Sequence, residues 1–168
     1  VLQGVDVVLC IDRGGLVGED GSTHHGAFDI AYFRCIPDIV ISAPMNEHEL
    51  RNLMYTAQTG GHGAFVIRYP RGEGALTDWH NPFQKIEIGK SRKLREGTDL
   101  AVLTLGHVGN IASEAIQELS ETVSVEHIDL RFAKPLDKEM LSNIGNRFDK
   151  IITIEDGVIN GGVGSAIL

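Results

Sequence analysis

The chain has 168 residues, enough for one large domain or two small ones. Its hydrophobic content of 42% and charged content of 23% are ordinary for a soluble globular protein. With 15 Lys and Arg against 23 Asp and Glu, the net charge is −8, which argues against nucleic acid or an anionic membrane surface as partner. No apolar run approaches the length of a membrane span, and no signal peptide is visible.

The first half of the chain alternates predicted strands and helices. Apolar runs predict parallel strands at residues 5–11, 38–43 and 64–69, the first of them buried. Residues 28–34 are expected to form a short helix. A second helix is predicted from Asn46 to Ala57, because its apolar residues recur at spacings of three and four; glycines follow it at 60, 61 and 63.

The second half repeats this alternation after a stretch of different composition. Residues 71–83 change in composition to Gly, Pro, Asp, Trp and Asn without periodicity, which indicates a linker or an irregular connection. A short extended pair is expected over 85–93. Strands are predicted at 99–105, 123–128 and 150–154, with helices at 109–119, at 137–144 (capped by Asp137) and from Gly162 onward.

The alternation predicts an α/β fold of two three-layer α/β/α units with mainly parallel sheets. We divide the chain into residues 1–72, a linker at 73–84, and residues 85–168. The first residue is not Met and the last lies in a predicted helix, so we expect a piece of a larger protein. Cys10 and Cys35 lie in apolar surroundings, which predicts buried, reduced thiols and a cytosolic setting.

Residues 12–26 are a glycine-rich loop loaded with ionisable groups, directly after the first strand. In parallel α/β sheets, ligands bind beyond the carboxyl ends of the strands. Arg13 follows the first strand and Arg71 the third, so both guanidinium groups are expected at the same edge. Two convergent arginines suit a phosphate, because each planar fork can make paired charge-assisted hydrogen bonds.

His24 and Asp20 are the other candidate functional residues of this loop. His24 can donate or accept a proton near neutral pH, and Asp20 could hold its tautomer or bind a substrate hydroxyl. A metal bound by His24, His25 and Asp20 is disfavoured, because adjacent histidines usually point apart and no third ligand has a recognisable spacing. The remaining histidines are interpreted as surface or structural: His48, His62, His80, His107 and His127.

The glycines near the end of the chain allow two interpretations. Gly161, Gly162 and Gly164 follow a strand and open a predicted helix, where glycines can cradle a phosphate. They can equally permit tight packing of helix against strand, and the pattern is not a full dinucleotide fingerprint. We favour packing.

Several of these motifs resemble a known family. Residues 12–21, 23–26, 28–37 and 68–72 are similar to the pyrimidine-domain signature of the 1-deoxy-D-xylulose-5-phosphate synthase family. Glu155-Asp156-Gly157 and residues 161–164 resemble the C-terminal domain of the transketolase superfamily. The resemblance spans essentially the whole chain. Gly14 departs from it, since the family usually has Ala there.

The resemblance implies an enzyme that uses thiamine diphosphate and Mg²⁺. Such an enzyme joins pyruvate to D-glyceraldehyde 3-phosphate and releases CO2. The product, 1-deoxy-D-xylulose 5-phosphate, is a precursor of isoprenoids, thiamine and pyridoxal. Arg13 and Arg71 would grip the aldehyde's phosphate, His24 would lie by the reacting carbons, and Asp20 would help to orient the substrate. A homodimer is implied, in the bacterial cytoplasm or in a plant plastid.

The resemblance also implies that this chain lacks half of the site. The domain that holds the cofactor's diphosphate and the metal, and the glutamate that activates the cofactor, have no counterpart here. We therefore expect no cofactor or metal on this chain alone, and no activity. Two rivals remain: a transketolase-like or 2-oxoacid dehydrogenase β-like component acting on other acceptors, and a non-catalytic dimerisation or nucleotide-binding module.

Overall fold

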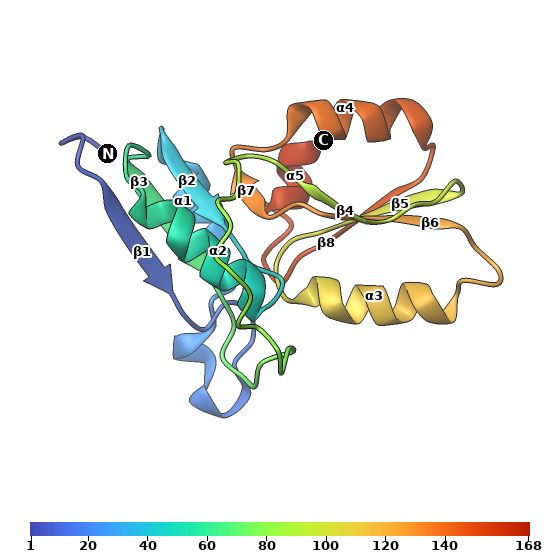
Figure 1. The fold of residues 1–168 in the computed structure, drawn as a ribbon, viewed down its shortest axis with the longest axis horizontal. Coiled ribbons are helices and arrows are strands. Elements are labelled where there is room, and N and C mark those ends of the chain that lie inside the picture. Colours follow the sequence, from blue (N-terminus) through green and yellow to red (C-terminus); the bar gives the residue numbers. More distant parts are fainter.

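A computed structural model describes all of residues 1–168. The chain forms two four-stranded sheets that lie side by side, each with helices on both faces (Figure 1). Three strands of each sheet are parallel, and the fourth is an antiparallel edge strand. The predicted fold class, two α/β units with mainly parallel sheets, is confirmed.

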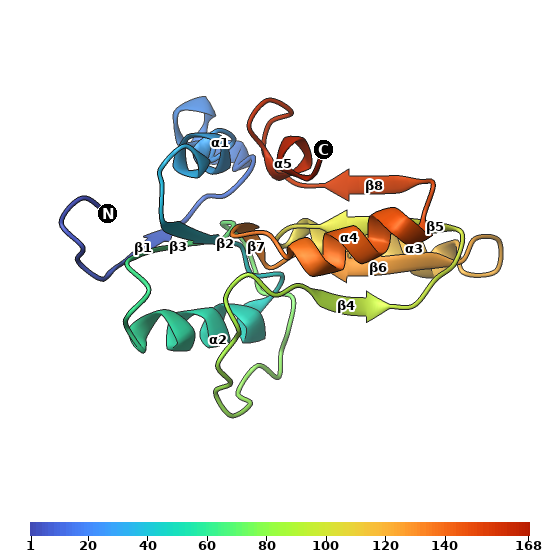
Figure 2. The ribbon, with the colours of Figure 1, turned by 90° about the horizontal axis from the view of Figure 1, so that it is seen from above.

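The first sheet has the order β1-β3-β2-β7. Its strands are β1 (Val7–Ile11), β3 (Ala64–Arg68), β2 (Ile39–Ser42) and β7 (Phe132–Lys134). Helix α1 (Asp29–Arg34) covers one face and α2 (Glu47–Gln58) the other (Figure 2). Asn46 caps α2, because its side chain accepts a hydrogen bond from the backbone N–H of Glu49 (3.0 Å).

The expectation that the first strand is buried is wrong. β1 pairs only with β3 at the edge of the sheet, and most of its residues are exposed. The same geometry corrects the prediction for the cysteines. Both are free thiols as expected, but Cys10 on β1 and Cys35 at the end of α1 are exposed rather than buried.

The second sheet has the order β4-β6-β5-β8. Its strands are β4 (Arg92–Arg95), β6 (Val125–Asp129), β5 (Leu100–Thr104) and β8 (Ile151–Ile154). Helix α3 (Val108–Glu118) lies on one face, with α4 (Lys138–Arg147) and the short α5 (Val163–Ile167) on the other (Figure 1). Asp137 caps α4 as predicted, accepting from the backbone N–H of Met140 (3.1 Å).

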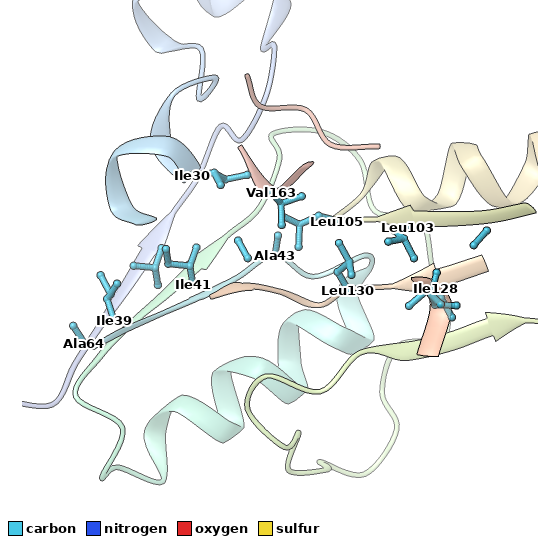
Figure 3. Close-up of a cluster of buried hydrophobic side chains, with 14 of the residues drawn as sticks. Ile30, Ile39, Ile41, Ala43, Ala64, Leu103, Leu105, Ile128, Leu130 and Val163 are labelled. Atoms are coloured by element: carbon cyan, nitrogen blue, oxygen red, sulfur yellow. The ribbon is translucent and has the colours of Figure 1, made fainter. Parts of the chain in front are cut away.

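Strand β7 joins the two sheets and was not predicted. It follows β6 in sequence, yet it pairs with β2 of the first sheet, antiparallel. One hydrophobic cluster correspondingly runs through both units (Figure 3). It combines residues of the first sheet, such as Ile39 and Ile41, with residues of the second, such as Leu103 and Ile128. The two units therefore share a core.

Residues 69–91 contain no helix or strand and connect β3 to β4. Of the extended pair expected at 85–93, only the start of β4 forms, because β4 pairs with β6 and not with the preceding residues. The division into residues 1–72, 73–84 and 85–168 stays a prediction. None of the helices is both long and apolar enough to span a bilayer.

Candidate active site

The loop of residues 12–26 closes on itself beyond the carboxyl end of β1. Gly15 and Gly26 exchange backbone hydrogen bonds of 3.0 and 2.9 Å, which join the two ends of the loop. Between them lie two single-turn 3₁₀ helices, Gly18–Asp20 and Ser22–His24. Gly21 separates these turns at φ +82°, a backbone conformation that favours glycine. The glycines thus shape a compact loop.

Arg13, Asp20 and Arg71 meet at this edge of the sheet. Arg13 Nε donates to Asp20 Oδ2 (2.9 Å), and Arg71 Nη1 lies 3.0 Å from Asp20 Oδ1. Arg13 also pairs with Asp12. The structure therefore brings together two arginines that are 58 positions apart in the chain (71 − 13) through one shared carboxylate.

Asp20 is held in its charged form by these arginines. Its pKa is lowered from 3.8, first by the hydrogen bond from Arg13 and further by the nearby charge of Arg71. The carboxylate is thus ionised at neutral pH and fixes the directions of both guanidinium groups. Arg71 is half-exposed, and Asp20 is its only charged partner, so most of its five N–H donors stay free.

His24 is next to this cluster but is not hydrogen-bonded to Asp20. Its Nδ1 lies 3.0 Å from the hydroxyl oxygen of Thr23, and the ring is exposed. The geometry does not show Asp20 holding the tautomer of His24. His25 Nδ1 accepts a hydrogen bond from the backbone N–H of Val17 (3.1 Å). His25 therefore supports the loop.

A buried ion-pair network supports the loop from beneath, and sequence reasoning missed it. Arg68, at the end of β3, is 3% exposed. It pairs with Asp29 (2.7 Å) and Asp156 (2.5 Å), and donates to the carbonyl oxygen of Gly26 (2.8 Å). The only signal in the sequence was a single charge at the end of an apolar strand.

The network also explains two glycines of the loop. A Cβ on Gly14 would lie 3.0 Å from the Arg68 guanidinium carbon, and one on Gly15 would collide with the Asp156 carboxylate. Gly15 additionally has φ +80°. Because Asp156 follows β8, the second unit helps to position the loop that carries Arg13.

A cavity of about 560 Å³ opens beside Arg71, between the two units. Tyr69, Asn46 and Glu47 line it from the first unit, and His107 and Asn110 from the second. His107 Nδ1 lies 3.5 Å from Asp156 Oδ2. His107 was interpreted as surface or structural, but it forms part of the wall of a cavity next to the candidate site.

The glycines before α5 are closely packed, in agreement with the favoured interpretation. Arg34 donates to the carbonyl oxygens of Gly161 (2.6 Å) and Gly162 (2.5 Å). A Cβ on Gly162 would overlap the carbonyl oxygen of Val158, and one on Gly161 would lie 3.0 Å from the methyl carbon of Ala31. The geometry leaves these glycines little space.

Two family models match the chain. The transketolase pyrimidine-binding domain matches residues 1–75, and the transketolase C-terminal domain matches residues 89–168. Among solved structures, a split-gene transketolase described as an inactive β4 tetramer is similar with a TM-score of 0.84 and 25% identity. This similarity covers 99% of the present chain and 53% of that structure's chain.

Curated relatives give a closer match. The chain is 60% identical to the 1-deoxy-D-xylulose-5-phosphate synthase of Phocaeicola vulgatus and 45% identical to that of Aquifex aeolicus. Both alignments cover 99% of this chain but only 27% and 26%, respectively, of the relatives' length. The chain belongs to the 1-deoxy-D-xylulose-5-phosphate synthase family of transketolase-like enzymes, of which it represents a partial segment.

Proposed function

We propose that the full-length protein carrying this segment condenses pyruvate with D-glyceraldehyde 3-phosphate, forming 1-deoxy-D-xylulose 5-phosphate and CO2. The observation that carries this proposal is the convergence of Arg13 and Arg71 on Asp20 at the carboxyl edge of the sheet. The relatives that bear this activity in their names support it. We also propose that this protein acts in the bacterial cytoplasm, since those relatives are bacterial, and that it forms the homodimer implied by the family resemblance.

In this proposal the segment binds the aldehyde's phosphate. Two guanidinium groups offer paired, charge-assisted hydrogen bonds to phosphate oxygens. Asp20 holds both groups in place before the substrate arrives, which reduces the side-chain entropy lost on binding. His24, exposed at the end of the same loop, would hold or move a proton near the acceptor carbonyl.

Thiamine diphosphate and Mg²⁺ would be bound by the rest of the protein. Mg²⁺ requires several oxygen ligands in octahedral geometry. In this chain no three His, Cys, Asp or Glu side chains gather closely enough to hold a metal ion. The role that we assign to the segment is binding of the acceptor.

Substitution of Arg71 tests the phosphate role. In the full-length enzyme we expect Arg71→Ala to raise the KM for D-glyceraldehyde 3-phosphate about 10- to 100-fold, the loss of one or two charge-assisted hydrogen bonds. The KM for pyruvate should change little. Arg95→Ala is the matched control, because Arg95 lies on β4 and hydrogen-bonds Gln117. Equal effects on both substrates would contradict the proposal.

Assays with other acceptors test the rivals. A transketolase-like protein would turn over ribose 5-phosphate, and a 2-oxoacid dehydrogenase component would transfer to lipoamide; we expect neither activity to exceed that with D-glyceraldehyde 3-phosphate. For the nucleotide-binding module, calorimetry with NAD or ATP is decisive. We expect no micromolar binding, because the glycines before α5 are packed against neighbouring atoms.

A further inference from the structure

The segment of residues 71–86 is held in place without backbone–backbone hydrogen bonds. No residue from 71 to 86 takes part in a backbone–backbone hydrogen bond. The chain there includes Gly72, at φ +157°, and Gly74, which add freedom to the backbone. Left to itself, this segment would leave Arg71 on a flexible support.

Four polar side chains of α2 replace the missing backbone bonds. Each one hydrogen-bonds the backbone of the segment, and their order along the helix matches the order of their partners. Glu47 accepts from Ala75 and Leu76, Arg51 donates to Trp79 and Asn81, Asn52 accepts from Gln84, and Thr56 accepts from Ile86. In Figures 1 and 2 the segment, in light green, lies alongside α2.

Glu47 makes the contact nearest to Arg71. Its two carboxylate oxygens each accept one backbone N–H, from Ala75 (2.8 Å) and from Leu76 (2.9 Å). A Cβ on Gly74 would lie only 2.5 Å from the same carboxylate, so glycine is what lets the loop approach so closely. Glu47 and Arg71 also line the same cavity.

From these contacts we propose that Glu47 is a positioning residue for Arg71. By fixing the backbone four and five residues after Arg71, Glu47 limits the positions that the guanidinium group can reach. Asp20 then directs the side chain from the opposite end. The inference rests on the phosphate role proposed for Arg71, and it assigns to α2 a part in recognition of phosphorylated acceptors.

The test compares a phosphorylated and a non-phosphorylated acceptor in the full-length enzyme. We expect Glu47→Ala to lower kcat/KM for D-glyceraldehyde 3-phosphate about 3- to 10-fold more than for D-glyceraldehyde, because both hydrogen bonds to the Glu47 carboxylate are lost but they act on the phosphate only through Arg71. The KM for pyruvate should be unchanged. Glu47→Gln keeps one acceptor oxygen, so a smaller phosphate-specific loss is expected. Asp78→Asn removes an exposed charge from the same segment, outside the cavity that Arg71 lines, and should behave as the unmodified enzyme.

The outcomes separate this inference from the proposed function. An equal loss for both acceptors in Glu47→Ala and Glu47→Gln, or no loss at all, would overturn the positioning role. Arg71→Ala is measured in parallel. If Arg71→Ala shows a phosphate-specific loss and the Glu47 variants do not, only the inference about Glu47 fails. If Arg71→Ala shows none, the phosphate role and the inference fall together.

Discussion

Arg68 is the residue that connects the candidate site to the rest of the molecule. It is the one arginine that is buried, and its charge is balanced by Asp29 from α1 and Asp156 from the end of β8. A buried charge is tolerated only when it is paired and hydrogen-bonded. Here the pairing also places Gly26, and thereby the loop that carries Arg13 and Asp20.

Replacing Arg68 by methionine should therefore be strongly destabilising. Arg68→Met leaves the buried Asp29 and the partly buried Asp156 without their cation, and breaking a buried pair in this way costs about 3 to 5 kcal/mol. We expect a loss of that size in the free energy of urea unfolding. Arg71→Met is the matched control, since Arg71 is half-exposed and its removal should cost at most about 1 kcal/mol. Similar losses for the two variants would refute this account.

Residues of the candidate site differ in how well the sequence predicts them. Arg13 and Arg71 follow strand ends, so the parallel-sheet rule is enough to expect them at one edge. The pairing of Asp20 with both arginines could not be predicted. Sequence patterns do not give the φ values that set the path of a glycine-rich loop. Arg68 and Glu47 were missed for a similar reason: their partners lie 88 and 28 positions away in the chain.

Helix α2 contacts two parts of the molecule, the first sheet and the segment that connects β3 to β4. Its apolar face, with Leu53 and Ala57, packs against the first sheet in a cluster with Phe65 and Ile67. Its polar side chains hold the segment that connects β3 to β4, and Arg51 contacts the aromatic residues of that segment. The Arg51 guanidinium carbon lies 5.2 Å from the ring centre of Trp79 and 4.4 Å from that of Phe83.

Removing Arg51 should loosen this segment without unfolding the protein. Arg51→Ala deletes two hydrogen bonds to backbone carbonyls and both cation–π contacts. Trp79 is the only tryptophan of the segment and of this chain. We expect its fluorescence in a purified sample of this chain to shift to longer wavelength, and chymotrypsin to cleave at Trp79 or Phe83 several-fold faster. Gln58→Ala, on an exposed position of the same helix, should change neither. Unaltered fluorescence and cleavage in Arg51→Ala would show that Arg51 does not restrain the segment.

The elements themselves were largely predictable, and the exceptions have a common cause. Helices α2, α3 and α4 formed close to the predicted ranges, α2 as its apolar spacing indicated and α4 with Asp137 as its cap. Strand β7 has only three residues and no recognisable period, and it exists because β2 offers an open edge. The burial of β1 was wrong because an apolar run does not reveal whether its strand is central or at an edge.

The two units form one folded body. β7 brings a strand from the second half into the first sheet, and the buried cluster shown in Figure 3 continues from one unit to the other. Charged contacts span the same junction, including the ion pairs of Glu49 on α2 with Arg92 on β4 and with Arg131. Because these contacts are shared, neither unit presents a complete core without the other.

Phe132 provides the test of this shared stability. It lies on β7 and is 1% exposed, packed in the cluster of the first unit with Val40 and Phe65. Phe132→Ala should cost about 3 to 5 kcal/mol, because a large side chain is lost from a close-packed site. Thermal unfolding followed by circular dichroism and by Trp79 fluorescence should show one transition, shifted equally in both signals. Leu119→Ala, at a residue that is 50% exposed at the end of α3, should shift it little. Two separate transitions, of which only one moves, would show that the units are stabilised independently and that β7 is an addition to the first sheet and not a joint between the two.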